Sequence, residues 1–150
     1  MNKISVIGAG TMGHSIALSV AWGNIPAYIY AIDVKEVERA TESILKKIET
    51  LVQSELLSER GSNQLLCNIH FTTSLDDCVK GTDFIIETVP ENLMIKKEIY
   101  RLIEAIIPQY IPIASNTSGI PTSNLSGEMI NPERFIITHF WNPAHLIPLV

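Results

Sequence analysis

The sequence has little of several things, and each shortage excludes a class of protein. Two cysteines, Cys67 and Cys78, are too few for a disulfide framework, and with four histidines they form no spacing typical of a metal site. The 11 basic residues are scattered and outnumbered by 16 acidic ones, and the net charge of −5 disfavours nucleic acid and anionic membranes as partners. No apolar run approaches the ~20 residues of a membrane span, and no cleavable leader is recognisable. We expect a cytoplasmic protein with two reduced, half-buried cysteines.

The residues that are present fit one globular domain of alternating strands and helices. Hydrophobic residues make up 46% of the chain and charged residues 18%, which supports a sizeable core. The spacing of apolar residues predicts short strands separated by amphipathic helices, with a break at Gly61-Ser62-Asn63. The expected strands are 3–7, 27–33, 69–72, 84–89, 111–115 and 135–140, with a seventh extended segment over 146–150, and the expected helices are 11–22, 35–57, a short one between Ser74 and Gly81, and 93–107.

This alternation predicts an α/β fold of the Rossmann type, a doubly wound and mainly parallel sheet with helices on both faces. Ligands of such sheets bind across the carboxyl ends of the strands. We therefore expect residues 1–150 to form one nucleotide-binding domain, with its site at that edge.

The most specific motif is Gly8-Ala9-Gly10-Thr11-Met12-Gly13, which follows the first apolar run and opens the first helix. Gly8 permits a tight turn out of the strand, Gly10 lets the backbone approach a pyrophosphate, and Gly13 lets the helix pack closely on the sheet. The helix N-terminus adds unpaired N–H groups and a partial positive charge. Residues 8–13 are therefore predicted to hold the phosphates of a dinucleotide.

Asp33 ends the second apolar run, 20 positions after Gly13. A carboxylate at this distance can accept hydrogen bonds from the adenosine ribose hydroxyls, and it would repel the 2′-phosphate of NADP. Only one cation, Lys35, lies beside it in the sequence. The cofactor predicted from these residues is NAD rather than NADP.

Three polar clusters directly follow predicted strands, at the edge where ligands bind: Pro90-Glu91-Asn92, Ser115-Asn116-Thr117-Ser118-Gly119, and His139 with Trp141-Asn142-Pro143. His139 is the best candidate for an acid or base, because an imidazole titrates near neutral pH. His14 is expected to be an ordinary helix residue, and His145 is a minor alternative to His139. For Asn116 and Thr117, turn formation and a functional role both remain open.

Five motifs thus occur in order along the chain: Gly8–Gly13, Asp33, Glu87–Asn92, Ser115–Ser118 and His139–Pro143. Together they resemble the NAD-binding domain of the L-3-hydroxyacyl-CoA dehydrogenase family, over essentially all 150 residues. The resemblance implies NAD as cofactor and, in fatty acid metabolism, oxidation of the 3-hydroxyl of an L-3-hydroxyacyl-CoA to the 3-ketoacyl-CoA. It also implies a homodimeric parent enzyme whose helical C-terminal substrate domain is absent from this chain, which alone would be inactive.

The same resemblance implies roles for individual residues. His139 would be the catalytic histidine, Ser118 would contact the substrate oxygen and the nicotinamide portion, and Asn142 would support the same region. Glu91 and Lys96 would lie along the cofactor. From the residues alone, Glu91 can also serve the electrostatics of a helix N-terminus, and Lys96 can be a solvated helix lysine. No residue is expected to bind a metal.

Two departures from the family pattern keep other substrates open. Pro148 stands where acyl-CoA members often carry a lysine, as in relatives that act on carnitine or sugar acids. The helix after Asp33 is shorter in the region where the family contacts coenzyme A, so no CoA-binding residue is assigned. A dehydrogenase of carnitine or of a sugar acid is therefore one alternative. A non-catalytic NAD-binding module is another, but binding alone would not require His139, Ser118 and Asn142 together.

Overall fold

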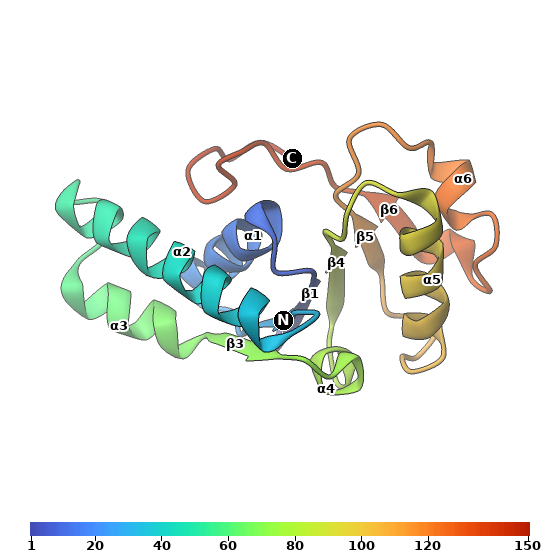
Figure 1. Cartoon of the computed structure of the whole chain (residues 1–150), viewed down its shortest axis with the longest axis horizontal. Helices are drawn as coiled ribbons and strands as arrows, with labels where there is room; N and C mark the ends of the chain where they lie inside the picture. The colour runs from blue at the N-terminus through green and yellow to red at the C-terminus, as the bar shows by residue number, and fades with distance from the viewer.

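The computed structural model describes all 150 residues, and its strands form one six-stranded sheet in the order β3-β2-β1-β4-β5-β6 (Figure 1). Every neighbouring pair of strands runs parallel. The strands are β1 (Ile4–Ile7), β2 (Ala27–Tyr30), β3 (Ile69–Thr72), β4 (Phe84–Glu87), β5 (Ile113–Ser115) and β6 (Phe135–Ile137). The predicted Rossmann-type fold is confirmed.

Helices cover both faces of this sheet (Figure 1). They are α1 (Thr11–Trp22), α2 (Val34–Gln53), α3 (Glu59–Cys67), α4 (Leu75–Val79), α5 (Leu93–Glu104) and α6 (Thr122–Ser126), with a short 3₁₀ turn at Pro132–Arg134. The first three helices share one hydrophobic core, and the last three share another on the opposite face. None of the helices combines the length and the apolarity needed to cross a bilayer.

Successive side chains of the central strand enter the two cores in turn. In β1, Ile4 and Val6 pack on the side of α1 and α2, whereas Ile7 packs on the side of α4 and α5. All four residues of the strand are buried. This period of two is what a parallel strand covered on both faces requires, and it holds the ends of the strands rigidly.

The long helix predicted over 35–57 is instead two helices. α2 ends at Gln53, and Glu55 then takes a left-handed φ of 58° that turns the chain back. Ser58 starts α3, its Oγ accepting a hydrogen bond from the N–H of Gly61 at 3.1 Å. The expected break at residues 61–63 is therefore wrong, because these residues lie inside a helix that is capped by Ser58 and anchored by the buried Leu65.

Several strands end earlier than predicted, at Tyr30, Glu87 and Ile137. The seventh extended segment over 146–150 is also wrong. The N–H groups of residues 146 and 147 both donate to the carbonyl of Pro143, at 3.0 and 3.1 Å, which curls the chain. This C-terminal segment runs past α1 without pairing with the sheet (Figure 1).

The short helix α4 forms as predicted, with Ser74 as its N-cap accepting a hydrogen bond from the N–H of Asp77 at 3.2 Å. It carries one of the two cysteines into the core. Cys78 is fully buried and Cys67 is exposed, so the expectation that both are half-buried is wrong. Burial raises the pKa of the Cys78 thiol to about 12, which makes it an inert packing residue.

Candidate functional site

The glycine-rich turn between β1 and α1 has the space that a phosphate group needs. Gly8 has a φ of +109°, and a Cβ on Gly13 would lie 1.9 Å from the Gly8 carbonyl oxygen, so only glycine permits this close packing. A Cβ on Gly10, in contrast, would meet no protein atom within 4 Å. No side chain caps α1, and its first N–H groups can therefore bind an anion. The turn fits the pyrophosphate of a dinucleotide.

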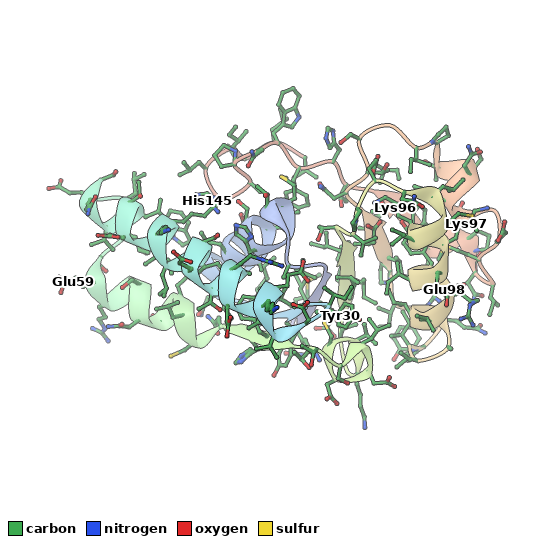
Figure 2. The ribbon with its side chains drawn as sticks, in the orientation of Figure 1. Tyr30, Glu59, Lys96, Lys97, Glu98 and His145 are labelled. Atoms are coloured by element: carbon green, nitrogen blue, oxygen red, sulfur yellow. The ribbon has the colours of Figure 1, made fainter.

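An apolar cavity of about 710 Å³ opens beside this turn, between the ends of β2 and β4 and the helix α5. Tyr30, labelled in Figure 2, lies on its wall, and Ile32, Val89 and Leu102 are among its apolar neighbours. Cavities of roughly 300–1,000 Å³ with largely apolar walls are typical of small-molecule sites. The size and lining suit the adenine ring of the same dinucleotide.

Asp33 lies outside the strand that was predicted to contain it, and it caps α2 instead. One carboxylate oxygen accepts a hydrogen bond from the N–H of Glu36 at 2.7 Å, while the other makes no hydrogen bond within the protein. Glu36 returns a similar contact, accepting from the N–H of Ile32 at 2.8 Å, and it lines the apolar cavity. The cap therefore leaves Asp33 one free acceptor oxygen and adds a second carboxylate at this end of the site.

Glu91 joins the polar clusters that follow β4 and β5. Its Oε1 accepts hydrogen bonds from the hydroxyl of Thr117 and from the N–H groups of Ser118 and Gly119, the latter two at 3.0 and 3.2 Å. Partial burial opposes its ionisation, but these hydrogen bonds and the Lys96 ammonium together lower the pKa of Glu91. The carboxylate therefore stays ionised and holds the loop over residues 117–119.

The structure refines the interpretation of two residues near the start of α5, Glu91 and Lys96. The N-cap of this helix is Asn92, whose Oδ1 accepts from two N–H groups of the first turn at 2.9 and 3.2 Å, so Glu91 makes no capping hydrogen bond to α5. Lys96 is not a solvated lysine, because its side chain is 1% exposed and its Nζ lies 2.7 Å from the Glu87 carboxylate. Lys96 and Lys97 point to opposite sides of α5, the first toward the sheet and the second toward α6 (Figure 2).

The cluster after β6 contacts the cluster after β5 through His139 and Ser118, which are both exposed. Ser118 Oγ lies 3.2 Å from His139 Nε2. The side-chain oxygen of Asn116 accepts from the N–H of Phe140 at 2.8 Å, which fixes the segment that carries His139 beside β5. No hydrogen bond joins Asn142 to either residue, and its side chain is exposed. The structure thus brings His139 to Ser118, and it gives Asn116 a connecting role.

A second, more polar cavity of about 270 Å³ extends from the glycine turn to Ser118 and Glu91. Gly10 borders both this cavity and the apolar one, so the two meet where the backbone has no side chain. An extended ligand with two nucleotides can therefore cross Gly10, with one half on each side. No cluster of three or more His, Cys, Asp and Glu side chains could hold a metal ion.

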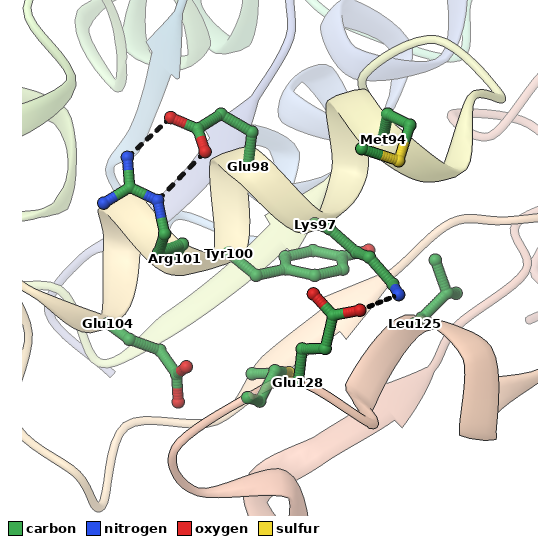
Figure 3. Close-up of a pocket in the computed structure, with 9 residues that line it drawn as sticks. Met94, Lys97, Glu98, Tyr100, Arg101, Glu104, Leu125 and Glu128 are labelled. Atoms are coloured by element: carbon green, nitrogen blue, oxygen red, sulfur yellow. Dashed lines mark hydrogen bonds and ion pairs between the residues drawn. The ribbon is translucent and has the colours of Figure 1, made fainter.

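A further pocket lies on the outer side of α5, between that helix and α6 (Figure 3). Four of its charged groups pair with one another, since Arg101 binds Glu98 at 2.6 Å and Lys97 binds Glu128, and the fifth, Glu104, binds Arg134 at 3.0 Å. No residue of the strand ends lines this pocket. It shares Met94 and Glu98 with the apolar cavity but reaches neither the glycine turn nor Ser118.

His14 is more than an ordinary helix residue, because it is buried between the glycine turn and α2. Its Nδ1 lies 3.2 Å from the Ala9 carbonyl oxygen and its Nε2 lies 2.7 Å from Lys47 Nζ. His145, labelled in Figure 2, binds the hydroxyl of Ser15 on α1 at 2.8 Å, whereas the partner of Ser118 is His139. Burial first, and then the positive charge of Lys47, lowers the pKa of both His14 and His145.

These lowered pKa values predict that the protein loses stability in mild acid. The ordinary value for both histidines is 6.5, so just below it the unfolded chain binds protons that the folded chain does not. The free energy of unfolding, measured with urea, should therefore fall between about pH 7.5 and about pH 5.5. His14→Gln should reduce this dependence. A dependence unaffected by His14→Gln would remove His14 as its source.

Residues 3–150 match a family model described as "3-hydroxyacyl-CoA dehydrogenase, NAD binding domain". Among curated proteins, 5-formyl-3-hydroxy-2-methylpyridine 4-carboxylate 5-dehydrogenase of Mesorhizobium japonicum is 36% identical over 150 residues, which are 100% of this chain and 48% of that protein. The lambda-crystallin homolog of Rattus norvegicus is 32% identical over 148 residues, 98% of this chain and 46% of the relative. The chain thus spans about half the length of these relatives.

Solved structures give the same result. The crystal structure of (S)-3-hydroxybutyryl-CoA dehydrogenase from Ralstonia eutropha superposes with a TM-score of 0.94 at 32% identity, covering 98% of this chain and 52% of the other. That of 3-hydroxybutyryl-CoA dehydrogenase from Escherichia coli superposes with a TM-score of 0.92 at 28% identity, covering 97% of this chain and 31% of the other.

Proposed function

This chain belongs to the 3-hydroxyacyl-CoA dehydrogenase family, and we propose that it forms the cofactor and proton-transfer half of an NAD-dependent dehydrogenase. The matching region is the NAD-binding domain of that family, so NAD is the cofactor, as predicted. The observation that carries the proposal is the contact of Ser118 with His139, at 3.2 Å, on the sheet edge that also holds the glycine turn. Nucleotide binding alone needs neither group, which disfavours a non-catalytic module.

When bound, NAD supplies a nicotinamide ring that accepts a hydride from the substrate carbon. His139 would accept the proton of a secondary hydroxyl, because its Nε2 faces the hydroxyl of Ser118. Ser118 would hold the substrate oxygen as it gains carbonyl character, and the exposed Asn142 side chain would be a second donor to it. In the reverse direction, the His139 imidazolium would return the proton.

Some residues would contact the cofactor directly, and one would affect it through a neighbouring side chain. The N–H groups of residues 8–13 would bind the pyrophosphate, and the free oxygen of Asp33 would bind the adenosine ribose. Glu91 would lie along the cofactor with a 45% exposed side chain. Lys96 is almost wholly buried, so it would influence the cofactor through Glu91 rather than by direct contact.

The substrate class that we propose is an L-3-hydroxyacyl-CoA, with fatty acid metabolism as its setting. Support comes from the family description and from the Ralstonia eutropha structure, which is a (S)-3-hydroxybutyryl-CoA dehydrogenase. A second candidate is a smaller hydroxy compound without coenzyme A, such as carnitine or a sugar acid. Pro148 favours it, and so does the relative at 36% identity, whose name describes a pyridine carboxylate as its substrate.

We further propose that the native protein contains a helical substrate domain after residue 150, forms a homodimer and resides in the cytoplasm. The greater length of the relatives supports the additional domain. An apolar groove lined by Trp22, Phe140 and Leu146, among others, is a surface that such a domain could cover.

The test compares substrates and cofactors in the native protein that contains this chain. NADH oxidation with acetoacetyl-CoA should proceed with a kcat/KM at least about tenfold above that with free acetoacetate or with dehydrocarnitine. NADPH in place of NADH is the cofactor control and should support little turnover. The chain of 150 residues alone should bind NADH, followed by fluorescence, with almost no turnover. Faster reduction of a free acid would reject the acyl-CoA assignment and favour the second candidate.

A further inference from the structure

Beneath the strand ends lies a buried group of polar side chains centred on Glu87, the last residue of β4. One carboxylate oxygen accepts hydrogen bonds from the N–H of Val89 and from Lys96 Nζ, both at 2.7 Å. The other oxygen accepts from the hydroxyls of Tyr100 and Ser115, at 2.5 and 2.6 Å. Glu87 is fully buried, so every contact that its charge has is with the protein.

Lys96 connects this group with the ligand edge of the sheet. Besides Glu87, its ammonium contacts the carbonyl oxygen of Val89 and the second carboxylate oxygen of Glu91, each at 3.3 Å. Of the three N–H donors of the ammonium, two have hydrogen-bond acceptors in Glu87 and Val89, and Glu91 adds an ion pair. These contacts fix the position of the Lys96 ammonium. The ammonium in turn attracts Oε2 of Glu91, while Oε1 of Glu91 accepts hydrogen bonds from the loop over residues 117–119.

The chain of contacts ends at Ser118 and His139, the two residues to which proton transfer was assigned above. Glu91 accepts from the N–H groups of Ser118 and Gly119, and the hydroxyl of Ser118 meets His139 at 3.2 Å. A buried ion pair commonly adds little stability compared with apolar side chains of similar volume. What it does supply is a fixed geometry, because each partner has one arrangement that satisfies its hydrogen bonds.

We propose that Glu87 is a positioning residue for Ser118 and His139, acting through Lys96 and Glu91. The carboxylate of Glu87 fixes the ammonium of Lys96, the ammonium fixes Glu91, and Glu91 holds the loop that carries Ser118. The role assigned to Ser118 and His139 rests on the proposed function, but the placement of the loop does not. The two ion pairs of the outer pocket beside α5 include none of these residues (Figure 3).

The test measures amide hydrogen exchange by NMR in the 150-residue chain, without NADH or substrate. In Glu87→Gln, the amides of Ser118 and Gly119 should exchange at least about tenfold faster relative to those of β1. The ring nitrogen shifts of His139 should change in the same variant. The control is Glu128→Gln, which removes the carboxylate that pairs with Lys97 on the outer side of α5. This variant should change neither the exchange rates nor the His139 shifts.

A second variant separates positioning from stability. Glu87→Gln combined with Lys96→Met removes both buried charges, so thermal stability should recover while residues 118 and 119 remain fast to exchange. If Glu87→Gln alone fails to fold, the exchange rates of residues 118 and 119 in the double variant test the proposal. Two results would overturn the proposal. In one, the amides of residues 118 and 119 exchange in the folded variants at the rate of the unaltered chain. In the other, their exchange accelerates only as much as that of the β1 amides. Failure of the dehydrogenase assays, with the exchange contrast retained, would instead reject the proposed function alone.

Discussion

Replacing Gly10 with valine is expected to weaken NADH binding at least about a hundredfold, a loss of about 2.7 kcal/mol, while the fold remains intact. The backbone of Gly10 has a φ of −63° and a ψ of −174°, which valine adopts without strain. A Cβ there would meet no protein atom within 4 Å, so we expect the fold to accommodate the side chain. It would instead project between the two cavities that meet at Gly10, where the pyrophosphate has to lie.

The measurement is fluorescence titration with NADH, together with urea unfolding of the same variant. Gly13→Val is the matched control with the opposite outcome, because its Cβ would lie 1.9 Å from the Gly8 carbonyl oxygen and the fold should be lost. If Gly10→Val bound NADH within about threefold of the unaltered chain, the turn would be a structural feature only.

In the native enzyme, His139→Ala is expected to lower kcat by about two to four orders of magnitude, the usual contribution of a positioned acid or base. The imidazole contacts Ser118 at the far end of the polar cavity, and no part of it lines the glycine turn. NADH affinity should therefore change by less than about threefold. Stopped-flow turnover and equilibrium binding measure the two quantities separately.

His145→Gln is the control for this experiment. It removes an imidazole six positions along the same segment, one that hydrogen-bonds to Ser15 on α1. Turnover within about threefold of the native enzyme is expected for this control. A loss below about tenfold in His139→Ala would contradict the catalytic assignment and leave His139 as a structural residue.

The features that depend on local sequence were predictable. The roles of Gly8 in a turn and of Gly13 in a close contact could be predicted from the motif alone, and the structure shows both. The bounds of α1 and β3 also agree with the sequence pattern. The clusters after β4, β5 and β6 could be placed at one edge because parallel strands bring their carboxyl ends together. The sequence therefore predicted correctly that these clusters lie at one edge of the sheet.

The features that depend on contacts distant in the chain were not predictable. Lys96 has the spacing of a surface lysine, and only the position of Glu87 on the neighbouring strand makes it a buried partner. His14 similarly depends on Lys47, 33 residues away. The division between α2 and α3 was missed because the helix propensities of residues 61–63 are poor, whereas the cap at Ser58 and the burial of Leu65 decide the outcome.

The place of β1 in the sheet has a consequence for how the protein is made. This strand precedes the other five in the chain, yet it lies between β2 and β4, with Ile4 paired to Ala27 on one side and to Phe84 on the other. On the ribosome, one edge of β1 therefore has no partner until residues 84–87 have emerged. Thr88 then closes the glycine turn by donating to the Gly8 carbonyl at 3.0 Å. The nascent chain thus completes the phosphate end of the site before His139, which follows later in the sequence, can reach Ser118.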